Sequence, residues 1–251
     1  MDVLDGWTLG EHTEPSALVP THPTYRKGTG PGVVVIAEVP GITAKVVTFA
    51  QEVVDQGFTV VLPHLFGEVP SRSTTGAAVR TLARACVSRE FTTLRRGETS
   101  PVATWLRSLA RTLHAELGGP GVGALGMCFT GGFALAMMVD DAVAAPVVAQ
   151  PSLPFAIGRA RGADLGLSSA DLDVVRRRAA AGCSVLGVKY AGDPAVGTRF
   201  DTLTQEIGDA FIRVELPGRQ HSTLTGQRRQ EAVDRVLAFF RETLLEADAP
   251  A

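Results

Sequence analysis

The feature that most constrains the fold is a short buried strand followed by an amphipathic helix and a second buried strand. Residues 33–37 are Val-Val-Val-Ile-Ala, a β-branched apolar run typical of a strand buried on both faces of a parallel sheet. Apolar residues at helical spacing extend from Thr43 to Gln56, and Gly57 supplies a C-terminal stop. Residues 58–62 form the next apolar run. This unit is the repeating element of a parallel α/β sheet, whose crossovers are almost always right-handed.

The rest of the chain repeats this unit. Further strands are predicted at residues 122–127, 144–149, 184–190 and 211–216. The pattern over 71–118 predicts two helical pieces that break near Gly97 and Pro101, and residues 231–245 form a closing amphipathic helix. We therefore expect an α/β fold with a mostly parallel central sheet and helices on both of its faces.

The length of 251 residues is one that a single α/β domain can occupy. Prolines and glycines are frequent before the first buried strand, as in irregular backbone. We therefore predict an irregular lead-in over 1–32, with or without one short edge strand, a single domain over 33–246 and a tail over 247–251.

The charge and the cysteine content disfavour several classes of function. The net charge of -2 gives no field that would draw the chain to nucleic acid or to anionic membranes. Asp140 and Asp141 interrupt the longest apolar stretch, so no membrane span is predicted. The three cysteines are too few for a disulfide framework and lack the spacing of a metal site. Since the first residues also lack the pattern of a signal peptide, we expect a cytoplasmic protein without a metal or cofactor.

The most informative motif is Gly-Met-Cys-Phe-Thr-Gly-Gly at residues 126–132, between a predicted strand and a predicted helix. A nucleophile elbow places its nucleophile on such a strained turn, with small neighbours that avoid clashes. Gly126 and Gly131 are small residues on either side of Cys128. The dipole of the following helix favours the thiolate form of Cys128, and the backbone N–H of Phe129 is placed to donate to an oxyanion.

A free cysteine is more often a small buried hydrophobe than a nucleophile. Cys86 and Cys183 lack the context of an elbow, and we assign both of them that structural role. For Cys128 the elbow favours catalysis. The motif departs from the usual pattern at Thr130, where glycine is usual, and a threonine there narrows the space around the turn.

The acid and the base of such a site follow the nucleophile in the order acid, then histidine. Asp193 lies in an Ala-Gly-Asp-Pro turn after the predicted strand 184–190, at the edge where active sites of open parallel sheets gather. His221 lies in a polar loop between the strand 211–216 and the final helix. We predict that Asp193 orients His221 and that His221 is the base, with Asp201 as the alternative acid.

The other histidines have weaker claims. His12 and His22 lie in the predicted lead-in, and His114 lies on the surface of a predicted helix. His64 follows a strand end and could line the cleft, but it precedes the elbow in the chain.

Four segments resemble motifs of the dienelactone hydrolase family, in the same order and at similar spacing over nearly the whole chain from about residue 33. They are Ala-Glu-Val-Pro-Gly at 37–41, Gly-Met-Cys-Phe at 126–129, Gly-Asp at 192–193 and His-Ser at 221–222. Leu-Pro-His-Leu-Phe-Gly at 62–67 resembles another segment, in which the family commonly has aspartate where this chain has His64. The resemblance implies an α/β-hydrolase fold and a Cys-His-Asp triad that forms a covalent thioester acyl-enzyme.

The resemblance also implies roles for other residues. Glu38 would contact the resting nucleophile and help to form the thiolate, and the backbone N–H of Val39 would join that of Phe129 in the oxyanion hole. Members of the family hold a substrate carboxylate with arginines, and the position of one of them is Thr225 here. The candidates for a second arginine of this kind are Arg80, Arg84 and Arg89.

The predicted function is therefore hydrolysis of a small-molecule lactone or carboxylic ester, by a monomer or weak homodimer with no nucleic-acid partner. The alternative is a non-catalytic relative that binds a small ligand or a partner protein in the same cleft, which Thr130 and Thr225 favour. An oxidoreductase is disfavoured, because no G-x-G-x-x-G motif follows the first strand. Whether 71–100 forms a lid stays open.

Overall fold

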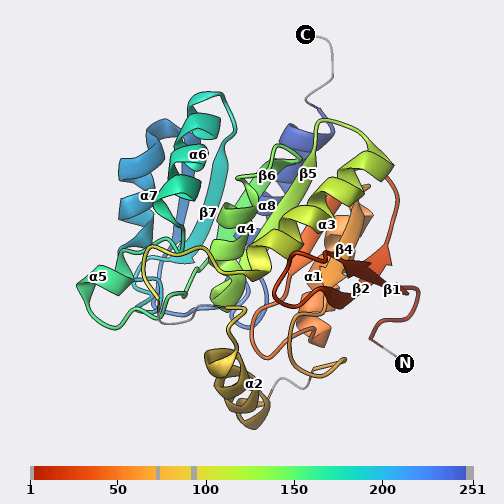
Figure 1. Cartoon of the computed structure of the whole chain (residues 1–251), viewed down its shortest axis with the longest axis horizontal. Helices are drawn as coiled ribbons and strands as arrows, with labels where there is room; N and C mark the ends of the chain where they lie inside the picture. Colours follow the sequence, from red (N-terminus) through yellow and green to blue (C-terminus); the bar gives the residue numbers. More distant parts are fainter. Residues whose placement is uncertain (1–2, 72–73, 92–94, 247–251) are drawn as a thin grey trace.

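A computed structural model describes residues 3–71, 74–91 and 95–246, except for the side chains of Cys86 and Val87 (Figure 1). Its centre is an eight-stranded sheet of order β1-β2-β4-β3-β5-β6-β7-β8. The strands are β1 (Thr8–Thr13), β2 (Thr21–Lys27), β3 (Gly32–Ile36), β4 (Thr59–Pro63), β5 (Val122–Met127), β6 (Val143–Ala149), β7 (Val185–Tyr190) and β8 (Phe211–Leu216). Neighbouring strands from β4 to β8 pair in parallel, whereas β1 and β2 pair antiparallel.

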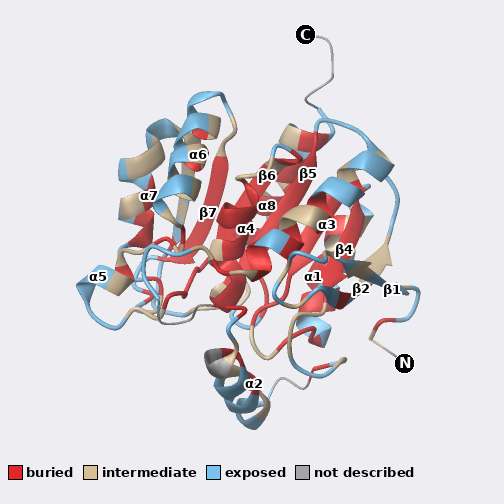
Figure 2. Ribbon diagram, viewed as in Figure 1, coloured by how far each residue is buried: buried red, intermediate tan, exposed pale blue. Residues whose placement is uncertain are grey.

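The central strands are buried on both faces, as their apolar runs predict. In β3, Val33 and Val35 pack into the apolar cluster on one face of the sheet, and Val34 and Ile36 pack into the cluster on the other. This alternation follows from the two-residue period of a strand. Figure 2 shows the strands of the sheet interior as buried between helices whose outer surfaces are exposed.

Helices cover both faces of the sheet, which confirms the predicted α/β architecture. The helices are α1 (Ala44–Asp55), α2 (Thr75–Val87), α3 (Val102–Leu117), α4 (Gly131–Met137), α5 (Arg159–Gly162), α6 (Ser169–Ala180), α7 (Arg199–Ile207) and α8 (Gln230–Leu244). Helices α1 and α8 pack on one face, and α3, α4, α6 and α7 pack on the other. Helix α2 projects from the body of the molecule (Figure 1). Within the described ranges, no helix has both the length and the apolar character needed to cross a bilayer.

The prediction of an irregular lead-in is wrong. Strands β1 and β2 form an antiparallel hairpin, and β2 extends the sheet by pairing with β4. In β2, the buried residues His22 and Thr24 alternate with the exposed residues Thr21 and Pro23. The buried face of this strand therefore carries polar side chains and no apolar ones at these positions. An edge hairpin that contains a proline and few apolar residues lacks the run that marks a buried strand, which explains the error.

Candidate active site

Cys128 lies on a strained turn between β5 and α4. Its φ of 54° falls in the left-handed region, which a non-glycine residue occupies only when the surrounding structure enforces it. Glycine is required beside it, because a Cβ on Gly126 would lie 2.1 Å from the carbonyl oxygen of Thr130. A Cβ on Gly131 would lie 2.6 Å from the Cα of Pro151. The geometry is therefore that of a nucleophile elbow.

Thr130 is accommodated in the elbow and does not distort it. Its side chain is fully buried, and its hydroxyl accepts from the backbone N–H of Met127 at 3.0 Å. The same hydroxyl lies 3.0 Å from the carbonyl oxygen of Ile36, to which it can donate. Thr130 thus connects the turn that carries Cys128 to the end of β3, where Glu38 and Val39 follow.

His221 and Asp193 meet at the edge formed by the carboxyl ends of the parallel strands. The imidazole Nδ1 of His221 donates to the Asp193 carboxylate at 2.6 Å. The other carboxylate oxygen accepts from the backbone N–H of Ala195 at 3.0 Å, and the Asp193 side chain is only 2% exposed. A turn and an ion pair therefore fix the orientation of the imidazole.

The electrostatics of His221 favour a positive charge beside Cys128. Burial lowers the pKa of His221, but the hydrogen bonds to Asp193 and Cys128 and the charges of both groups outweigh it and raise the pKa to about 10. The imidazole is then protonated at neutral pH, with Nδ1 facing the carboxylate and a second N–H for the sulfur.

The alternative acid and base candidates lie outside this arrangement. Asp201 forms an exposed ion pair with Arg213 at 2.8 Å. His64 contacts the carbonyl oxygen of Gly67 through Nε2 at 3.1 Å. His22 is buried against Glu90 and belongs to the packing of the β1–β2 hairpin.

Glu38 follows β3 and is buried beside the elbow. One of its carboxylate oxygens accepts from the Ser222 hydroxyl at 2.9 Å, and the other accepts from the Thr225 hydroxyl. Thr225, at the position where the family resemblance implies an arginine, therefore holds Glu38 by a hydrogen bond without adding a charge.

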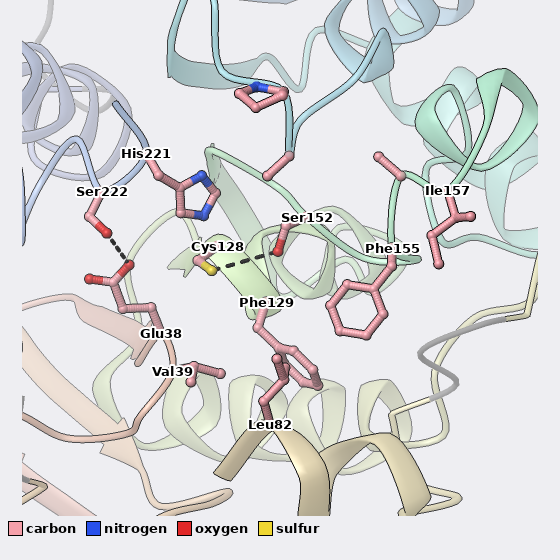
Figure 3. Close-up of a pocket in the computed structure, with 13 residues that line it drawn as sticks. Glu38, Val39, Leu82, Cys128, Phe129, Ser152, Phe155, Ile157, His221 and Ser222 are labelled. Carbon is pink, nitrogen blue, oxygen red and sulfur yellow. Dashed lines mark hydrogen bonds between the residues drawn. The ribbon is translucent and has the colours of Figure 1, made fainter. Parts of the chain in front are cut away.

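These residues open into a cavity of about 570 Å³. Its lining consists of Glu38, Val39, Leu82, Cys128, Phe129, Ser152, Phe155, Ala156, Ile157, Pro194, Ala195, His221 and Ser222. The close-up in Figure 3 shows Cys128 between Glu38 and His221 on one side and Phe129 and Phe155 on the other.

The structure does not bring the three candidate arginines into this cavity. Arg80 and Arg84 line a separate small pocket beside Pro40, and Arg89 is exposed. Leu82 of α2 does line the cavity.

Sequence reasoning missed Ser152. Its hydroxyl lies 3.6 Å from the Cys128 sulfur, and its backbone N–H donates to the carbonyl oxygen of Cys128 at 2.9 Å. Ser152 follows β6 by three residues, so it reaches the same edge of the sheet as Glu38 and Asp193. A search for polar residues just after each predicted strand would have found it.

Cys183 lies outside the cavity. Its sulfur contacts the carbonyl oxygen of Ala144 at 3.5 Å, and burial raises the pKa of its thiol. The prediction for Cys86 concerns a side chain outside the described part of the structure. Among the residues that are described, no three His, Cys, Asp or Glu side chains gather so as to hold a metal ion.

The parallel sheet, the cysteine elbow and the His–Asp pair on later loops define a protein of the α/β-hydrolase class. The model of the dienelactone hydrolase family matches residues 18–171, which is more than half of the 251 residues. The chain therefore belongs to the dienelactone hydrolase family. Glu38 and Cys128 lie within the matched segment, and Asp193 and His221 follow it.

Solved structures share the fold at low sequence identity. A dienelactone hydrolase-like promiscuous phosphotriesterase from metagenomic libraries is 17% identical, with a TM-score of 0.65 over 95% of this chain and 99% of that one. The dienelactone hydrolase of Anabaena variabilis is 15% identical, with a TM-score of 0.61 over 94% and 99%. A cold-adapted esterase from an Arctic intertidal metagenomic library is 14% identical, with a TM-score of 0.56 over 93% and 94%. A comparison with curated proteins gave no match.

Proposed function

We propose that the protein hydrolyses a lactone or small carboxylic ester with Cys128 as the nucleophile, His221 as the proton carrier and Asp193 as the orienting acid. The observation that carries the proposal is the His221–Asp193 hydrogen bond of 2.6 Å beside a cysteine held at φ 54°, all at one cavity. A nucleophile, a base within reach and a third group that orients the base are the parts that covalent catalysis requires.

In the acylation half of the reaction, the Cys128 thiolate attacks the carbonyl carbon of the ester. The carbonyl oxygen becomes an oxyanion, which the backbone N–H groups of Phe129 and Val39 stabilise. When the tetrahedral intermediate collapses, the bond to the alcohol breaks and His221 gives its proton to the leaving oxygen. A thioester on Cys128 and a neutral imidazole remain.

In the deacylation half, the neutral His221 takes a proton from water as the water oxygen attacks the thioester carbonyl. The second tetrahedral intermediate expels the Cys128 thiolate and releases the carboxylic acid. His221 is again protonated and Cys128 is again a thiolate, as at the start of the acylation step. The buried Asp193 stabilises the imidazolium and holds its orientation throughout.

The alternative function, a non-catalytic relative that binds a ligand in the same cleft, has less support. It rests in part on crowding by Thr130, and this side chain makes hydrogen bonds within an intact elbow. The absence of an arginine at Thr225 concerns the choice of substrate and leaves the three proposed catalytic groups in place.

Thiol alkylation tests the proposed function. One equivalent of iodoacetamide at neutral pH is expected to label Cys128 before Cys86 and Cys183, because the nearby imidazolium favours the reactive thiolate. Peptide mapping gives the labelled residue, and hydrolysis of a p-nitrophenyl ester gives the activity that remains. Loss of activity in proportion to labelling at Cys128 supports the proposal. Full labelling of Cys128 with retained hydrolysis contradicts it.

The pH dependence of this alkylation provides a second prediction. A pKa of about 10 keeps His221 positively charged from about pH 7 to 9 and allows it to lose its charge only above this range. At each pH in this range, alkylation of Cys128 is therefore expected to be faster in the wild type than in His221→Ala, which lacks the positive charge beside the sulfur. The two rates should approach each other above this range, where His221 loses its charge. A constant ratio of the two rates from about pH 7 to 11 would contradict this role of His221.

A further inference from the structure

The cavity has two chemically different sides. Figure 3 shows Glu38, His221 and Ser222 on one side of Cys128 and Leu82, Phe129, Phe155 and Ile157 on the other. The first side carries a carboxylate, an imidazole and a hydroxyl. Apart from the Ser152 hydroxyl beside the sulfur, the second side consists of aliphatic and aromatic side chains from α2, the elbow and the loop between β6 and α5.

The proposed reaction fixes how an ester lies across these sides. His221 must give its proton to the leaving oxygen, so the alcohol portion lies beside the imidazole on the polar side. The carbonyl oxygen points to the backbone N–H groups of Phe129 and Val39. The remaining substituent of the carbonyl carbon, the acyl chain, then extends toward Phe155 and Ile157 because the other directions from that carbon are taken.

Among its described residues, the apolar side offers no cationic partner for a negative charge. None of the described residues that line the cavity is a lysine or an arginine. The lining does include Glu38, whose carboxylate would repel a second negative charge. The Thr225 hydroxyl donates its hydrogen bond to Glu38, and Arg80 and Arg84 line another pocket. A carboxylate on the acyl chain would lose its hydration against aromatic and aliphatic carbon without gaining an ion pair.

We propose that the substrate is an uncharged ester or lactone with an apolar acyl portion, and that Leu82, Phe155 and Ile157 bind that portion. This inference rests on the proposed function, because it uses His221 as the group that protonates the leaving oxygen. It separates this chain from members of its family that hold a substrate carboxylate with arginines.

A matched pair of esters tests the proposal. p-Nitrophenyl pentanoate and the mono-p-nitrophenyl ester of glutaric acid have the same acyl length and differ in a terminal carboxylate. We expect kcat/KM, corrected for the spontaneous hydrolysis of each ester, to be at least about 50-fold higher for the neutral ester, since the carboxylate must be desolvated. From acetate to pentanoate it should rise by up to about fourfold per methylene.

The outcomes separate this inference from the proposed function. Equal or faster turnover of the glutaric ester, still abolished in Cys128→Ala, would overturn the substrate class and leave the nucleophile in place. Hydrolysis that persists in Cys128→Ala would overturn the proposed function and this inference with it.

A charge placed on the acyl side locates the binding surface. Ile157→Lys should lower the preference for the neutral ester about tenfold, because the new ammonium can pair with the carboxylate of the glutaric ester. Val79→Lys is the matched control: Val79 is 61% exposed and Ile157 is 65% exposed, but only Ile157 lines the cavity. The control should keep the wild-type preference. An equal change in both variants would indicate long-range attraction and contradict the assignment to Ile157.

Discussion

Replacement of Cys128 by alanine is expected to lower kcat/KM for ester hydrolysis by at least about a thousandfold, equivalent to about 4 kcal/mol of transition-state stabilisation. The variant keeps the oxyanion donors and the His221–Asp193 pair, so the residual rate would come from attack by water alone. Since Cβ is retained, the strained turn at Cys128 should form as in the wild type. The measurement is the steady-state hydrolysis of a neutral p-nitrophenyl ester.

Cys183→Ala is the control for the loss of a thiol. Its sulfur is half-buried and lies outside the cavity, so the activity of this variant should stay within about twofold of the wild type. A loss of less than about tenfold in Cys128→Ala would show that another group performs the attack.

Replacement of Arg199 by methionine is expected to produce the largest loss of stability. Arg199 begins α7 and is 1% exposed, and burial lowers the pKa of its guanidinium to about 10. Its guanidinium donates to five backbone carbonyl oxygens, those of Pro154, Arg161, Asp164, Ala195 and Val196. It therefore joins the loop after β6 to the loop after β7, and both loops line the cavity.

Methionine fills a similar space but leaves these carbonyl groups without their donor. Because an unsatisfied buried polar group costs about 1 to 3 kcal/mol, we expect Arg199→Met to lose at least about 3 kcal/mol in the free energy of unfolding. For a chain of this size that lowers Tm by roughly 6 to 12 °C. Urea unfolding followed by circular dichroism measures the change.

The control for Arg199 is Arg177→Met. Arg177 is exposed on α6, so its replacement should change the stability by less than about 0.5 kcal/mol. Equal stabilities of the two variants would contradict the view that Arg199 holds the two loops together.

The parallel part of the fold was predictable because its strands are buried on both faces. The runs at 33–37 and 122–127 contain almost only apolar residues, and few other structures accommodate such runs between amphipathic helices. The β1–β2 hairpin was missed because an edge hairpin packs a few side chains and exposes the rest. Helices α6 and α7 were not predicted either, because α6 fully buries only Val175 and Ala179 and the apolar face of α7 is short.

The candidate site was predictable where local sequence determines geometry. The glycines beside Cys128 are required by close backbone contacts, so the elbow is visible in the sequence itself. Asp193 and His221 could be placed only by their order in the chain and their positions after predicted strands, because their hydrogen bond is a tertiary contact between residues 28 positions apart. Ser152 could have been found as a polar residue just after a predicted strand, whereas the apolar side of the cavity depends on how loops after different strands converge, for which the sequence has no short-range signal.

Identification of the acylated residue shows directly which side chain is the nucleophile. The protein is mixed with an activated ester, quenched in acid within the first turnovers and digested, and the peptides are analysed by mass spectrometry. We expect the acyl group on Cys128, with accumulation increased in a His221→Ala variant acylated at high pH, since deacylation then lacks its base. An acyl group on Ser152, whose hydroxyl lies 3.6 Å from the sulfur, would contradict it.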